Sequence, residues 1–556
     1  HIDGDITLMD EVDVVGGTAT FHGNMDGQTF RLQDGARAIM GVDVDNDTGF
    51  TGTFVNPWTA NPDGTLAVEV AGAEGGSSAG QWIFGAGTTV DGNFQAVVLP
   101  DLYEDVTTYA GVVQTGGFAG AFTNVSDTSA FLNAELVVNG NNFDLVLTRT
   151  AFNALSGAGD NANGLGGVLE AAYQDYLGGN PIDPDLLPVI QTLFATNGED
   201  ANEFMAQVAG SSYAQSGYLA QAIMQQVYGF LQNRQADSRA VANAAQSTER
   251  GQTAALGDSD TVAGLTQEAS TSHPVARGEN GFSVWGEGLA GFGSRDGDDE
   301  AQGYDRDSWG AAIGLDYLMG ESFLIGAAGH YLATSADFDG FGDEVDVDSF
   351  GFSLYGSWQP GQLYVDVGAN VSFNSYESTR YLPTGLGTEE FEGDYDGTSY
   401  GFYAESGWRF DLGRFAITPS AGIAYTSIST DSFTETGTAS GLALQSDGID
   451  PDSFTTTLMV RANSSFEIGG MLLAHELRVG WQHEFLDAPE ADMAFVVAPN
   501  SPFTVVGSEV VKDSALIGTS LSLGVMSNVE VFIDYDTRLG GGDTSHAIGL
   551  GGRVAF

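Results

Sequence analysis

Long segments in which apolar and polar residues alternate are the feature that most constrains the fold of this chain. They follow one another through residues 281–556 and are separated by turns rich in Gly, Asp, Ser and Asn. In one segment Leu363, Val365 and Val367 fall on one face, and Tyr364 and Asp366 on the other. Alternation with a period of two indicates β-strands that have one apolar and one polar face.

The length of these segments favours strands that cross a membrane. Strands of soluble sandwiches have about five or six residues, whereas a tilted strand needs about 9–11 residues to cross a bilayer, with its apolar face toward lipid. We therefore predict an antiparallel transmembrane β-barrel, and an even number of strands is typical of bacterial barrels. The twelve expected strands begin near residues 282, 308, 322, 346, 362, 397, 414, 453, 472, 513, 528 and 545.

The connections between the expected strands also alternate in length. Short turns such as Met319-Gly320-Glu321 and Pro360-Gly361 alternate with long acidic connections. In outer-membrane barrels, the short turns lie in the periplasm and the long loops lie outside the cell. The expected long loops are residues 294–307, 336–345, 376–396, 428–452 and 486–512. A large soluble β-sandwich is the alternative interpretation.

Composition excludes several classes of protein. The chain has 75 Asp plus Glu against 17 Lys plus Arg, for a net charge of -58, so we expect no nucleic-acid partner. It has no cysteine, which excludes disulfides and thiolate chemistry. Hydrophobic residues make up 42% of the chain, which is too many for a disordered polyanion. No long apolar run that would form a spanning helix occurs.

Several motifs in the second half resemble the β-domain of autotransporters, the proteins of type V secretion. They are GFSVWGEG at residues 281–288, GFYAESGWRF at 401–410 and RVGWQHEF at 478–485. The order and spacing of these motifs, over the whole of 281–556, carry the resemblance. It implies a 12-stranded outer-membrane barrel in a Gram-negative cell, joined to a secreted passenger domain.

The last strand carries a second resemblance. Ile548, Leu550, Val554 and the terminal Phe556 share one face. Such a strand resembles the signal by which barrel-assembly machinery recognises outer-membrane proteins, and a sheet edge that must still pair is suited to recognition. The resemblance implies four partners: this machinery, periplasmic chaperones, outer-membrane lipid and lipopolysaccharide.

Residues 152–280 are expected to form a helical linker that plugs the pore. A short helix should follow Pro181, Pro184 and Pro188. The segment Glu203–Asn233 is predicted to be helical because it is rich in Ala, Gln, Met and Leu. Residues 208–215 resemble the segment that precedes the barrel in autotransporters. Either 201–236 or 237–256 would then fill the pore.

Three of the few arginines, Arg234, Arg239 and Arg250, fall where the linker would enter the barrel. Glu476 and Arg478 lie on the polar face of an expected strand. Arginine–carboxylate pairs that are shielded from water are strong. We therefore predict that these five residues hold the plug, although the three arginines would also suit a solvated helix.

Residues 1–151 are predicted to be almost entirely β-structure, with short apolar runs and many Asp-Gly and Asn-Gly turns. Their order resembles the C-terminal end of an autotransporter passenger. This resemblance implies a β-helix that ends in a stable cap, with a β-sandwich as the alternative fold. We also expect an upstream part of the passenger before His1.

No pattern of residues forms a convincing catalytic site. Residues 76–80 match G-x-S-x-G, but the helix that the motif requires is not expected after them. Asp43, Asp45 and Asp47 have the spacing of a calcium loop, yet the glycine comes one place late, so a solvated turn is the main interpretation. We therefore expect no enzyme, no cofactor and no metal.

The predicted function is secretion: the barrel would insert in the outer membrane and display its own passenger at the cell surface. A porin-like channel, or a structural surface protein with a β-rich lid, is the alternative. A secreted hydrolase is a third possibility. The sequence does not fix the oligomeric state.

Overall fold

The computed structural model describes residues 2–59, 61–72, 77–255, 281–320, 322–384, 387–412, 415–468, 471–526 and 528–556, and residues 240–255 by their backbone only. The chain divides into two compact units. The first comprises His1–Ala209, Leu382–Glu389 and Ala439–Leu442. The second comprises Gly210–Tyr381, Glu390–Thr438 and Ala443–Phe556. Each unit is described separately below.

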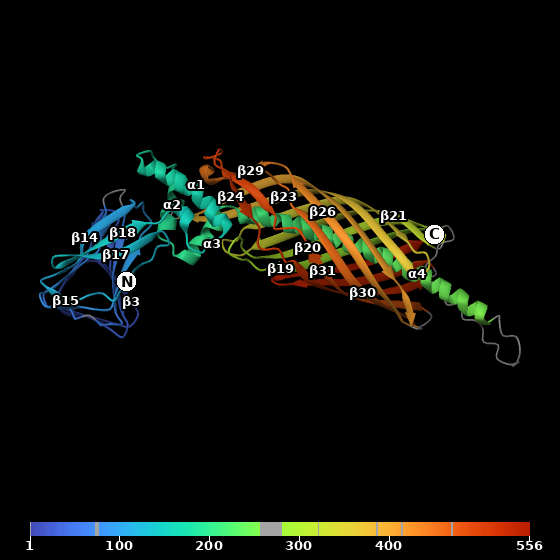
Figure 1. Ribbon diagram of the computed structural model, residues 1–556, viewed down its shortest axis with the longest axis horizontal. Coiled ribbons are helices and arrows are strands. Elements are labelled where there is room, and N and C mark those ends of the chain that lie inside the picture. The colour runs from blue at the N-terminus through green and yellow to red at the C-terminus, as the bar shows by residue number, and fades with distance from the viewer. Residues whose placement is uncertain are drawn as a thin grey trace. The chain divides into compact units, whose positions relative to one another are not determined.

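Twelve long antiparallel strands of the second unit form a closed barrel (Figure 1). Each pairs with the next long strand in sequence, and the last pairs with the first, Val284 lying opposite Val554. The strands are β19 (Phe282–Arg295), β20 (Tyr304–Met319), β21 (Phe323–Phe338), β22 (Glu344–Trp358), β23 (Leu363–Thr384), β24 (Gly387–Trp408), β26 (Phe415–Thr430), β30 (Asp452–Ile468), β31 (Met471–Glu484), β34 (Asp513–Met526), β35 (Val529–Gly540) and β36 (Asp543–Ala555). The predicted 12-stranded antiparallel barrel is confirmed.

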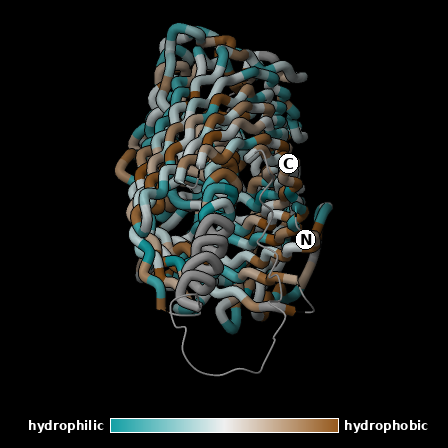
Figure 2. The backbone as a smooth tube through the Cα atoms, turned by 90° about the vertical axis from the view of Figure 1, so that its right-hand side faces the viewer, coloured by the Kyte–Doolittle hydropathy of each residue, from teal (hydrophilic) through white to brown (hydrophobic). Residues whose placement is uncertain are grey.

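Alternation along the strands gives the barrel an apolar outer face and a polar inner face. In β22, Phe350, Phe352 and Leu354 are exposed on one face, while Ser349 and Ser353 on the other face are buried. The same change of hydropathy from residue to residue runs along the barrel strands in Figure 2. An apolar outer band suits contact with lipid.

The strands begin within a few residues of the predicted positions, with one exception. β24 begins at Gly387 rather than near residue 397, because β23 and β24 extend far along the predicted loop 376–396. This loop prediction was wrong. Alternation continues through these extensions, where Tyr376 and Tyr395 are buried and stacked 4.7 Å apart.

Two other predicted loops contain a small sheet. The order of its strands is β27-β29-β32-β33, and it draws on residues from both the 428–452 and the 486–512 loops. Two further short strands, at residues 410–412 and 436–437, extend the barrel sheet. The short elements are β25 (Phe410–Leu412), β27 (Phe433–Thr434), β28 (Thr436–Gly437), η2 (Ser440–Leu442), β29 (Leu444–Ile449), β32 (Glu490–Phe495) and β33 (Phe503–Val506).

The helices lie between the two β-regions of the sequence. They are η1 (Phe152–Ala154), α1 (Asp160–Leu177), α2 (Leu187–Phe194), α3 (Gly198–Val208) and α4 (Ser211–Ala255). The predicted single helix Glu203–Asn233 is interrupted, because Gly210 has a positive φ of 81°, which ends helical geometry. Among the described residues, no helix combines the length and apolar character needed to cross a membrane.

Strands of the first unit stack as the coils of a β-helix. In one sheet, Asn93 of β13 pairs in parallel with Thr65 of β9 and with Asn124 of β16. In the other, Trp82 of β11 lies parallel to Gly52 of β8 and Val113 of β14. The stack ends in the antiparallel hairpin β17–β18.

The strands of the first unit are short, and their bounds are as follows. They are β1 (Ile2–Asp3), β2 (Ile6–Val15), β3 (Thr18–His22), β4 (Met25–Gln33), β5 (Arg37–Met40), β6 (Val42–Asp43), β7 (Thr48–Gly49), β8 (Thr51–Phe54), β9 (Thr65–Ala71), β10 (Ser78–Ala79), β11 (Gln81–Phe84), β12 (Thr88–Val90), β13 (Asn93–Val98), β14 (Val106–Thr115), β15 (Phe118–Gly120), β16 (Asn124–Asp127), β17 (Leu132–Asn139) and β18 (Asn142–Arg149). Aromatic rings fill the space between the sheets. Phe54 stacks on Phe84 at 5.9 Å, and Phe84 stacks on Trp58 at 5.1 Å.

Candidate functional site

Helix α4 runs along the inside of the barrel (Figure 1). Its residues from Ser211 to Arg239 contact the inner wall through side chains that point in several directions around the helix. An amphipathic helix has one polar and one apolar face, whereas this helix is covered on all sides. The stretch of α4 whose side chains are buried in the lumen, residues 211–239, overlaps mostly with the first of the two predicted ranges, 201–236.

The first turns of α4 are held by a buried ion pair of the wall. Arg380 donates two hydrogen bonds to Glu435, of 2.8 and 2.7 Å, and both side chains are completely buried. The Tyr213 hydroxyl of α4 donates to the same carboxylate at 2.9 Å. One turn further along, Tyr218 donates to the backbone carbonyl of Ser508 at 2.8 Å.

Asp343 lies beside this ion pair, in the connection between β21 and β22. It is buried and accepts a hydrogen bond of 2.9 Å from the Tyr381 backbone N–H. Burial raises the pKa of the Asp343 carboxyl to about 6, although this hydrogen bond and the charge of Arg380 act in the opposite direction. Near neutral pH, Asp343 is therefore close to its titration range.

Two of the predicted arginines reach carboxylates on the inner wall. Arg234 donates a hydrogen bond to Asp316 at 2.7 Å, and Arg239 forms an ion pair with Asp366. The Arg239 guanidinium also lies 3.9 Å from the centre of the Tyr364 ring. Both arginines are buried rather than solvated. The side chain of Arg250 lies outside the described residues.

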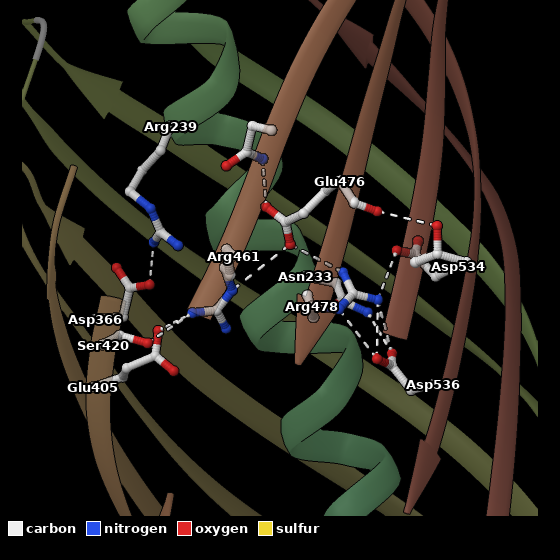
Figure 3. Close-up of polar contacts among 12 residues, drawn as sticks. Asn233, Arg239, Asp366, Glu405, Ser420, Arg461, Glu476, Arg478, Asp534 and Asp536 are labelled. Carbon is white, nitrogen blue, oxygen red and sulfur yellow. Dashed lines mark hydrogen bonds and ion pairs between the residues drawn. The ribbon is translucent and has the colours of Figure 1, made fainter. Parts of the chain in front are cut away.

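A network of ion pairs on the wall surrounds the middle of α4 (Figure 3). The predicted Glu476 and Arg478 are both part of it, joined by a hydrogen bond of 3.2 Å. Arg478 also donates two hydrogen bonds of 3.1 Å to Asp536, and this carboxylate accepts one of 3.2 Å from Asn233 of the helix. These contacts thus connect two wall strands, β31 and β35, with α4.

Arg461 extends the network and was not singled out by the sequence analysis. It donates to Glu405 at 2.6 Å and to Ser420 at 3.2 Å, and its Nε lies 3.6 Å from Glu476. Arg461 lies on the polar face of an alternating strand, so its inward direction was predictable. Its partners were not, because strand pairing and shear decide which inward side chains meet.

A cavity of about 200 Å³ remains between α4 and the wall. Its lining combines carboxylates, amides, threonines and a few apolar side chains with the arginines Arg461, Arg478 and Arg538. The helix therefore does not fill the lumen completely.

The residues of the predicted assembly signal lie on the last strand, β36. Ile548, Leu550 and Phe556 are exposed on the outer face, at 38%, 63% and 55% of their full area, and Val554 is partly exposed there. The backbone N–H of Phe556 donates to the carbonyl of Phe282 at 2.8 Å, so this residue takes part in closing the barrel. The role of these residues in assembly stays a prediction.

The calcium candidate lies in the first unit, at the turn between β6 and β7. Asp43 accepts a hydrogen bond of 2.9 Å from the Asn46 side chain, Asp45 is exposed, and Asp47 has a positive φ of 49°. Within the described part of the chain, no three acidic or histidine side chains are arranged to hold a metal ion.

Comparison with known proteins assigns the barrel to a class. Residues 284–536 match the sequence model of the family described as "Autotransporter beta-domain". This part of the chain is an autotransporter β-domain, and it is an outer-membrane barrel that is not itself catalytic.

Curated relatives cover most of this chain. An extracellular serine protease of Serratia marcescens is 23% identical over 80% of this chain and 42% of its own length. Outer membrane protein B of Rickettsia prowazekii is 24% identical over 84% of this chain and 27% of its own length. The chain thus spans less than half the length of these relatives.

Two solved translocator structures are also similar to the barrel. The translocator domain of NalP from Neisseria meningitidis has a TM-score of 0.41 and 13% identity, covering 57% of this chain and 96% of its own. The β-domain of BrkA from Bordetella has a TM-score of 0.37 and 18% identity, covering 50% of this chain and 100% of its own.

Proposed function

We propose that this chain is the C-terminal part of an autotransporter that secretes or displays its own passenger at the cell surface. The observation that carries the proposal is helix α4 inside the closed barrel, held by buried pairs to Asp316 and Asp366. The helix continues directly from the first unit in sequence. A barrel whose lumen contains its own upstream chain is suited to exporting that chain rather than to conducting solutes.

The proposed organisation follows the order of the sequence. Residues 1–151 are the end of a β-helical passenger, residues 152–280 are the linker and plug, and residues 281–556 are the translocator. The hairpin β17–β18 supports a role as a cap, because antiparallel pairing ends a stack of parallel coils. We propose that the passenger acts by display or adhesion rather than by catalysis, and the protease activity in the name of the Serratia relative belongs to that protein.

The proposed partners follow from the surfaces of the barrel. Its exposed apolar outer face suits outer-membrane lipid and lipopolysaccharide, and its terminal strand suits barrel-assembly machinery and periplasmic chaperones. The net charge of -58 supports the absence of a nucleic-acid partner.

Conductance of the purified chain in a planar bilayer tests the plug. We expect low conductance for the intact chain and a higher one for the double variant Arg234→Gln, Arg239→Gln, because the helix loses two charged contacts. Arg31→Gln is the control, since its ion pair with Glu11 lies in the first unit. A large, steady pore in the intact chain would support the porin-like alternative instead.

Surface labelling of whole cells tests export. An epitope inserted at Gly140, in the turn of the β17–β18 hairpin, should be accessible to antibody on intact cells. An epitope that becomes accessible only after the outer membrane is permeabilised would contradict the proposal.

A further inference from the structure

Two carboxylates in the barrel lumen are buried without a hydrogen-bond partner among the described residues. Glu287 of β19 is 7% exposed. Asp534 of β35 is 4% exposed, and neither of its oxygens accepts a hydrogen bond. Its nearest guanidinium, that of Arg478, lies 3.7 Å away and is hydrogen-bonded to other carboxylates.

Both carboxylates lie beside the same glycine of β36, Gly549. Gly549 of β36 lies directly opposite Asp534 in the strand ladder. A Cβ atom built at Gly549 would fall 1.8 Å from Glu287 Oε1, so Glu287 lies across this glycine from the neighbouring strand. The absence of a side chain at Gly549 thus leaves room for two acidic groups, one on each of the strands that flank β36.

The cavity of about 200 Å³ between α4 and the wall is lined by both carboxylates. Asp536 and Asn233 also line it, as do the apolar side chains of Leu289, Met459 and Leu516. The Asn233 amide nitrogen donates to Asp536, which leaves its oxygen available as an acceptor. Three arginines line the cavity as well, and each is paired with a carboxylate: Arg461 with Glu405, Arg478 with Asp536 and Arg538 with Asp543. Glu287 and Asp534 are the lining acids that accept no hydrogen bond among the described residues.

A buried carboxylate that accepts no hydrogen bond is costly, and the cost is reduced when a cation supplies hydrogen bonds. A metal ion does not suit this place, because the described residues contain no group of three acidic or histidine side chains placed to hold one. Drug-sized ligands need about 300–1,000 Å³, so the cavity suits a smaller molecule. An ammonium group donates three hydrogen bonds, which two carboxylates and an amide oxygen would accept.

We propose that the lumen cavity binds a small organic ammonium ion, with its charged group between Glu287 and Asp534 and its methylene groups against Leu289 and Leu516. Bound in this way, the ion neutralises the acidic wall beside α4. It thereby stabilises the plugged state of the barrel.

Titration calorimetry on the purified full chain in detergent tests the proposal, with 1,4-diaminobutane as the probe. The double variant Glu287→Gln, Asp534→Asn should weaken binding by roughly tenfold or more, because charge-assisted hydrogen bonds are the strong ones. The matched control is Asp346→Asn, Glu377→Gln, which removes two exposed acids from the outer face. It should leave the affinity unchanged.

The neutral isostere 1,4-butanediol gives a second measurement on the unaltered chain, which does not depend on how the variants fold. We expect no binding of the diol. Equal binding of diol and diamine would overturn the proposal. So would an unchanged affinity in the lumen variant, or an equal loss in the outer-face control, which would indicate general attraction to an acidic surface.

Discussion

Arg380 and Glu435 show how single residues hold the plug in place. The Glu435 carboxylate accepts four hydrogen bonds: two from Arg380, one from Tyr213 of α4 and one of 2.6 Å from the Leu444 backbone N–H. A buried ion pair stabilises a fold only when such bonds replace the lost water. The hydrogen bond from Tyr213 forms only when α4 is in the lumen, so helix and wall stabilise each other.

Removing one partner of this pair should be strongly destabilising. We expect Arg380→Gln to lower the free energy of unfolding by about 3–5 kcal/mol, because Glu435 remains buried without its main cation. Arg409→Gln is the matched control, since the Arg409–Asp411 pair is partly exposed and should contribute at most about 1 kcal/mol. Denaturant titration in detergent measures both, and equal effects of the two variants would contradict this account.

Asp343 should make the stability of the barrel depend on pH. Its folded pKa of about 6 lies above the value of about 3.9 for an unfolded aspartate. The folded state therefore binds the proton more tightly, and the destabilising effect of the charged carboxylate disappears as the pH falls from about 6 to about 4.

The variant Asp343→Asn isolates this effect, since its side-chain oxygen can still accept from Tyr381. We expect it to be more stable than the parent chain at pH 8, and the difference to vanish near pH 4. Unfolding midpoints measured across this range provide the check. A difference that grows toward low pH would show that the sign is wrong.

At the scale of elements, adjacent strands fit together where an aromatic ring lies over a glycine. Tyr355 lies over Gly326 and Trp285 over Gly314, each directly opposite in the ladder. A Cβ at Gly368 would likewise fall 2.2 Å from the Tyr403 ring. These glycines let large inward rings pack flat against the wall and leave space for α4.

Gly368→Ala should destabilise the barrel by about 1–3 kcal/mol, as overpacking does. The displaced Tyr403 would lose its hydrogen bond of 2.7 Å to Gln235 of α4. Gly329→Ala is the control, because the nearest atom to its Cβ would be 3.8 Å away. Heat-induced unfolding in detergent compares the two, and a neutral Gly368→Ala would count against this packing.

At the scale of the whole molecule, the barrel is completed by its two ends. The first strand β19 and the last strand β36 pair along their length, so all twelve strands must form before the wall closes. A free terminal strand is an unpaired edge until then. This supports the prediction that Phe556 acts during assembly rather than in the finished barrel.

We expect Phe556→Ser to reduce the amount of folded barrel in the outer membrane several-fold, with little change in the stability of the barrel that does form. Phe485→Ser is the control, since Phe485 is similarly exposed, at 52% against 55%, but follows β31, away from the closing strands β19 and β36. Gel mobility of unheated membrane samples distinguishes folded from unfolded chains. The same loss in both variants would point to lipid contact instead.

The sequence by itself determined the strands, their number and their two faces, because alternation is a local property that each strand carries alone. The inward direction of Arg461, Glu476 and Arg478 was predictable for the same reason. A helix over most of the plug was also predictable from local propensity. The break at Gly210 was missed, since glycine inside a helical pattern is tolerated in many helices.

Only the tertiary structure decided which charged groups meet. Arg239 and Asp366, and Arg380 and Glu435, are far apart in sequence and come together through the stagger of the closed wall and the position of the helix within it. Glu287 and Asp534, which accept no hydrogen bond among the described residues, became apparent for the same reason. Closure brings the first and last strands of the barrel side by side, and alternation along one strand carries no information about a neighbour that distant.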